Sequence, residues 1–156
     1  MQTKWANIIQ ANRTIILEQW LDRSLALFPA KMGRSTPVAE ALSEALERIL
    51  SGLENNNDDV PDALNDVTRI LAVQEFPPSR AISIFFEPKV ILREMMNKSI
   101  VADTLTQEVQ EAFNARMDNL VLAAFDSYMR HREKIYQLKV EESSRRMHMV
   151  LRRAEA

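Results

Sequence analysis

The last third of this chain contains no residue that breaks a helix. From Asp103 to Ala156 there is neither proline nor glycine. Apolar residues recur at three- and four-residue steps from Val109 to Phe125, the spacing of one face of a helix. A helix rises about 1.5 Å per residue, so a helix this long must extend beyond any body the chain can form. Its projecting half needs a partner, or it stays loosely ordered.

The rest of the sequence predicts further helices, several of them started by proline. An apolar stripe spans Lys4 to Phe28, where Asn12 is a candidate break. Thr36 precedes Pro37 as an N-cap precedes the first helical residue, and Pro61 and Pro78 mark two later starts. Only two glycines occur, few for a sheet protein with tight turns. We therefore predict a single all-α domain of five or six helices with a long C-terminal helix.

The helix expected after Pro78 is apolar around much of its circumference, so it should lie near the centre of the core. Pro88 falls inside it. Proline has no backbone N–H and its ring collides with the carbonyl four residues earlier, here that of Ile84. The sequence predicts a kink at this point.

The charge distribution separates the two parts of the chain. Residues 130–156 carry eight Lys/Arg and four Asp/Glu, a net +4, and the remaining residues therefore carry −6 of the total −2. Acidic residues interrupt the basic run, which favours a solvated helix face and no nucleic-acid partner. We expect residues 1–130 to form a sensor-like domain and residues 131–156 to extend its last helix.

No residue pattern points to catalysis, a metal or a membrane. The chain has no cysteine, and its two histidines, His131 and His148, lie far apart in the charged C-terminal part. The longest apolar run, Leu120 to Phe125, is far shorter than the ~20 residues of a membrane span. The start of the chain lacks the features of a signal peptide. These observations predict a non-enzymatic, cytoplasmic protein without a bound metal.

Two surfaces are candidate functional sites. Large aromatic side chains pack the core by default, and they are also candidates to enclose a small apolar cavity, lined by Trp20, Phe85, Phe86 and Phe113. On the last helix a seven-residue spacing, typical of coiled coils, suggests a homodimer contact at Val121, Phe125, Tyr128, Ile135 and Leu138. In that interpretation Glu142 and Arg145 end the seam. The alternative is that the stripe is buried within its own domain.

Several segments resemble the RsbR/RsbRD-type N-terminal domain, a sensory module. The opening helix, Arg13 to Pro29, and the proline-started segment Ser35 to Leu50 are similar to that family in pattern. The most specific block is Ile70 to Met96, with Ala72-Val73-Gln74, Glu75-Phe76, Pro78-Ser79, Ala81 and a late Arg93-Glu94 pair. The resemblance covers about residues 13 to 130.

The resemblance implies a globin-like helical domain that dimerises, performs no catalysis, and signals through its long C-terminal helix to a STAS domain. The chain of 156 residues has no room for a STAS domain, so we expect a standalone module whose output comes from a separate protein. A haem would need a histidine on the central helix, and Arg80 to Met96 contains none. We therefore expect no cofactor.

These expectations define two candidate functions. The first is a non-catalytic signalling module of a stress response, acting by protein–protein interaction as a homodimer. The alternative is a globin-like sensor that holds haem, a lipid or another small apolar molecule in its helical core. The sequence names neither the signal nor the partner.

Overall fold

A computed structural model describes residues 4–29, 32–55, 59–74, 76–97 and 106–155. The helices are α1 (Lys4–Ala11), α2 (Arg13–Ala26), α3 (Pro37–Asn55), α4 (Val60–Val73), α5 (Pro78–Ser83), the 3-10 turn η1 (Ile84–Phe86), α6 (Glu87–Asn97) and α7 (Gln107–Glu155). The described residues contain no strand. The predicted all-α fold with a long C-terminal helix is confirmed. The first stripe divides at Asn12 into α1 and α2.

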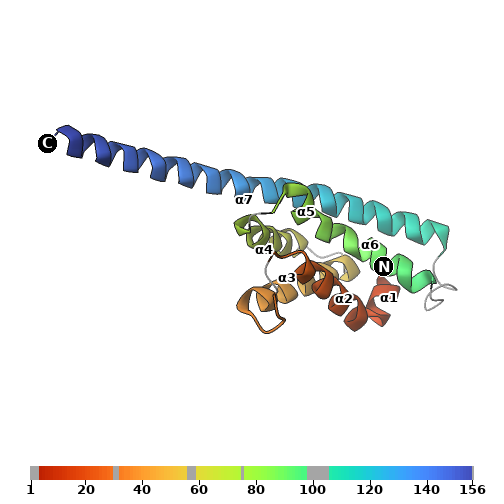
Figure 1. The fold of residues 1–156 in the computed structure, drawn as a ribbon. Helices are drawn as coiled ribbons and strands as arrows, with labels where there is room; N and C mark the ends of the chain where they lie inside the picture. Colours follow the sequence, from red (N-terminus) through yellow and green to blue (C-terminus); the bar gives the residue numbers. More distant parts are fainter. Residues whose placement is uncertain (1–3, 30–31, 56–58, 75, 98–105, 156) are drawn as a thin grey trace.

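Helices α1 to α6 gather beneath one half of α7, and the other half projects away from them (Figure 1). Helix α3 packs against α1, α2 and α4, and α4 in turn packs against α7. One apolar cluster joins these helices, and its largest fully buried side chains include Trp20, Phe85 and Tyr128. Full burial of a large apolar side chain stabilises a fold by about 1.5–3 kcal/mol, so this cluster holds the body together.

The start of α3 follows the predicted cap. The Thr36 side-chain oxygen accepts a hydrogen bond from the backbone N–H of Ala39 at 3.2 Å, and Pro37 is the first helical residue. The spacing of Thr104 and Gln107 predicts a capping box at the start of α7, and Thr104 lies outside the described residues. There the hydroxyl of Thr106 accepts from the backbone N–H of Val109 at 3.3 Å.

The central helix is interrupted just before Pro88. The turn η1 separates α5 from α6, and Pro88 is the second residue of α6. Because Pro88 has no N–H, the carbonyl of Ile84 lacks its α-helical partner and accepts from the backbone N–H of Glu87 in the 3-10 turn. The buried indole N–H of Trp20 also donates to that carbonyl, at 2.8 Å. The expected disturbance is therefore present as a 3-10 turn, and it joins α2 to the central helix.

Candidate functional site

Three polar contacts fasten α7 to α4 where α7 leaves the body. The hydroxyls of Thr68 and Ser127 are 2.6 Å apart and buried. His131 Nε2 lies 2.9 Å from the side-chain oxygen of Asn65. The guanidinium of Arg132 donates to the carbonyl of Ala72 at 2.8 Å. Ala72 is in the last turn of α4, so this contact satisfies a carbonyl that the helix itself leaves unpaired.

The pKa of His131 is lowered at this junction. Burial lowers it most, and the positive charges of Arg69, Arg130 and Lys134 lower it further, whereas the hydrogen bond that Nε2 donates to the side-chain oxygen of Asn65 raises it. The neighbouring Tyr128 is fully buried, and burial raises the pKa of its hydroxyl. Burial therefore disfavours the charged forms of both side chains where α7 leaves the body.

Beyond this junction α7 has no cover from the described residues of its own chain. Every residue from Tyr136 to Glu155 is exposed. At about 1.5 Å per residue, this segment extends roughly 30 Å from the body. An isolated helix of this length has marginal stability in water, because helices in proteins gain most of their stability from packing an apolar face.

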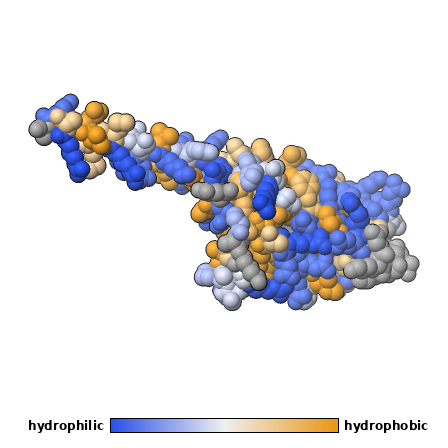
Figure 2. Space-filling model, viewed as in Figure 1, coloured by the Kyte–Doolittle hydropathy of each residue, from blue (hydrophilic) through white to orange (hydrophobic). Residues whose placement is uncertain are grey.

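Exposed apolar side chains follow one side of α7 from the body into this segment. At about 100° per residue they fall within an arc of roughly 100°. Figure 2 shows apolar residues at intervals along the projecting half. We call this set the α7 stripe: Leu122, Phe125, Tyr136, Val140, Met147 and Val150. All six are between 47% and 66% exposed, which is unusual for apolar side chains that share one face.

The outer part of the stripe has the period of a coiled coil. From Tyr136 onward, apolar or small residues alternate at four- and three-residue steps, at Tyr136, Val140, Ser143, Met147, Val150 and Ala154. This average of 3.5 residues keeps one seam facing a partner helix along its whole length.

Basic residues accompany the seam on one side. They recur every seven residues, at Arg132, Lys139, Arg146 and Arg153. The other side carries Arg130, Gln137, Ser144 and Leu151 at the same seven-residue spacing. In an antiparallel pair of identical helices the basic row would face itself. In a parallel pair the basic side chains Arg132, Lys139 and Arg146 face the uncharged Gln137, Ser144 and Leu151 of the second copy, which favours the parallel arrangement.

The five residues predicted for the dimer contact do not share one surface. Tyr128 is fully buried, and Val121 and Ile135 are partly buried against the domain's own core. Phe125 and Leu138 are exposed, but they are thirteen residues apart and lie roughly 140° apart around the helix. Tyr128 is thus a core residue, because the 121/128/135 seam faces the body. Of the five, Phe125 belongs to the α7 stripe.

The four residues predicted to line an apolar cavity are also divided. Trp20, Phe85 and Phe113 are buried in the core. Phe86 is 44% exposed, since consecutive residues in a helical turn point in different directions and only Phe85 can face inward. Phe113 reaches a cleft between α6 and α7 that the other three do not line.

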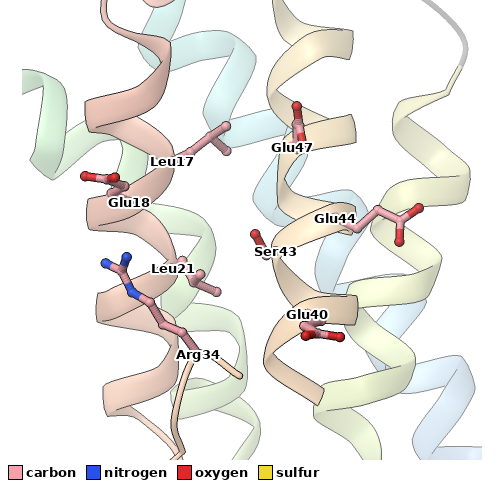
Figure 3. Close-up of a pocket in the computed structure, with 8 residues that line it drawn as sticks. All are labelled: Leu17, Glu18, Leu21, Arg34, Glu40, Ser43, Glu44 and Glu47. Atoms are coloured by element: carbon pink, nitrogen blue, oxygen red, sulfur yellow. The ribbon is translucent and has the colours of Figure 1, made fainter. Parts of the chain in front are cut away.

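A separate open groove of about 440 Å³ lies between α2 and α3. Leu17 and Leu21 contribute apolar lining, and carboxylates from both helices surround it, at Glu18, Glu40, Glu44 and Glu47 (Figure 3). Arg34 at its edge donates three hydrogen bonds of 2.7–2.9 Å to the carboxylate of Asp22. Across the described residues, no three acidic, histidine or cysteine side chains are arranged to hold a metal ion together. We assign this groove no ligand.

The architecture is that of an all-α body with a projecting helix whose apolar face is exposed. The family model for the RsbT co-antagonist protein rsbRD N-terminal domain matches residues 15–142. The chain therefore belongs to the RsbRD N-terminal domain family, as the sequence predicted, and this is a family of regulatory signalling domains. The match runs from α2 to the first turns of the projecting half of α7 and leaves out α1.

An uncharacterized protein of Archaeoglobus fulgidus is 32% identical over 147 residues, which cover 89% of each chain. No solved structure gives a significant match. Within the residues that the structure describes, no helix is long and apolar enough to span a membrane.

Proposed function

We propose that this chain is a non-catalytic regulatory module of a stress-response signalling system that works as a parallel homodimer paired along α7. The observation that supports this proposal is the α7 stripe, which leaves large apolar side chains in water unless a second helix covers it. Two-fold pairing of identical surfaces is the commonest way to cover such a face. The proposal requires no cofactor.

The pairing gives the module a means of output. Parallel helices would place both bodies at one end and both projecting ends together at the other. A change in the body that alters the α4–α7 contacts would then change how the two projecting ends are presented to a separate partner protein. On the body side, the α4–α7 contacts are made by Asn65, Thr68 and Ala72.

The mass of the protein in solution tests the pairing. One chain has a mass of 18.0 kDa, so light scattering at micromolar concentration should report twice that value. Dilution should shift the mass toward that of a single chain, because the seam is short. A mass of one chain at every micromolar concentration would exclude the homodimer.

A further inference from the structure

We propose that the cleft between α6 and α7 binds a small carboxylate that carries a short apolar chain. The cleft has a volume of about 300 Å³. It is lined by Lys89, Leu92, Arg93 and Met96 from α6 and by Gln110, Phe113 and Asn114 from α7. This volume is at the lower end of the range for small-molecule pockets, about 300–1,000 Å³, so the ligand must be small. The inference is independent of whether α7 pairs with a second copy.

The inner wall of the cleft is apolar and fixed in place. Leu92 and Phe113 are buried, and Met96 packs against the same core from a partly buried position. The ring of Phe113 meets the ring of Trp5 edge to face, with centroids 5.8 Å apart. This contact connects the wall to α1, so the surface that an apolar chain would cover is already formed without a ligand.

The rim of the cleft is positively charged. Lys89 is ion-paired with Asp118, whereas Arg93 is exposed and makes no ion pair with any carboxylate that the structure describes. The acidic residues of α6 do not offset this charge. Glu87 and Glu94 are both paired with Arg23 of α2, at 3.0 Å and 2.5 Å. Helix α6 thus has its acids paired with α2. Of the two cationic side chains that it places at the cleft, Lys89 is offset by Asp118, so Arg93 supplies the net positive charge.

The remaining polar groups also suit an anion. Gln110 and Asn114 are side-chain amides, each with two N–H donors. A guanidinium binds a carboxylate with two parallel hydrogen bonds, the geometry in which arginine is strongest. The charge of Arg93 disfavours a positively charged ligand, and a neutral apolar ligand would leave Arg93 unused. A carboxylate with a short apolar chain uses both the wall and the rim.

Binding of octanoate tests directly whether the cleft takes a carboxylate with a short apolar chain. Calorimetry on the full chain should show saturable binding of about one octanoate per chain. Octanol has the same chain without the charge, and its affinity should be lower by roughly fivefold or more. Octylammonium should not bind. In NMR spectra the side-chain amides of Gln110 and Asn114 should shift with octanoate. Absence of octanoate binding up to millimolar concentration, or equal affinity for octanoate and octanol, would overturn the proposal.

Variants locate the site. Arg93→Gln should lower octanoate affinity about fivefold and leave octanol affinity unchanged. Arg80→Gln is the matched control, because Arg80 is an exposed arginine on α5 outside the cleft, and it should change neither affinity. Asn114→Trp fills the cleft from its exposed rim and should abolish binding of both ligands. The proposal fails if Arg93→Gln and Arg80→Gln behave alike, or if the Asn114→Trp variant still binds octanoate.

Discussion

Replacing Val140 and Met147 together with lysine is expected to convert the homodimer into a monomer. Both side chains lie in the outer seam of the α7 stripe, and they are 63% and 62% exposed in the single chain. In the pair they would face their counterparts, so the double variant places four like charges in an apolar contact. An unpaired buried charge costs several kcal/mol, and the dimer should weaken by roughly a thousandfold or more, about 4 kcal/mol. Light scattering at micromolar concentration measures the loss.

The matched control is the pair Leu138→Lys and Met149→Lys. These side chains are 54% and 56% exposed on the same helix, and they lie on the side opposite the stripe. The control adds the same charge to the same segment and should remain dimeric. Equal dissociation of both double variants would mean that positive charge on α7, and not the stripe, controls assembly. If neither variant dissociates, the stripe is not the contact.

Replacing Trp20 with phenylalanine should cause a large loss of fold stability. Trp20 is fully buried, and its indole N–H donates to the Ile84 carbonyl, which lacks its α-helical partner because residue 88 is proline. The variant loses that hydrogen bond and part of the packed volume. We expect the free energy of unfolding to fall by about 2–3 kcal/mol, or the melting temperature to fall by roughly 5–10 °C.

Trp5→Phe is the control for that experiment. Trp5 is also buried, but its indole makes no hydrogen bond to any described residue, and its ring contacts Phe113. Its replacement should cost about 1 kcal/mol, because only packing is lost. Both variants are to be melted at the same protein concentration, since dimerisation itself raises the melting temperature. Equal losses in the two variants would show that the hydrogen bond to Ile84 contributes nothing measurable.

Local rules predicted most of the fold. The three- and four-residue spacing of apolar side chains gave the helices, and Thr36 with Pro37 gave the start of α3. Pro88 marked the place where the central helix is interrupted. The sequence could not show that Trp20, distant along the chain, completes the interrupted hydrogen bonding, because that contact exists only after the helices have packed.

The candidate site was predicted less well, because α7 has two apolar faces. The 121/128/135 seam has the coiled-coil period but packs on the body, and Glu142 ends it. The second face is the α7 stripe, which runs beside the first face as far as Ile135 and then continues alone toward the C-terminal end of α7. Its signal was present in the sequence as the alternating steps from Tyr136 to Val150. The spacing of apolar residues predicts that one face of a helix is buried. It does not say whether the element that packs on this face belongs to the same chain or to another.

The most direct test of parallel pairing along α7 is a disulfide cross-link at Val150. The chain has no cysteine, so Val150→Cys introduces a single thiol at a seam position. A parallel, in-register pair brings the two thiols close enough to join, and oxidation should give a covalent dimer in high yield. Met149→Cys, on the opposite side, should give little. An antiparallel pair or a monomer would give no more cross-linking at residue 150 than at residue 149, and that result would contradict the parallel homodimer.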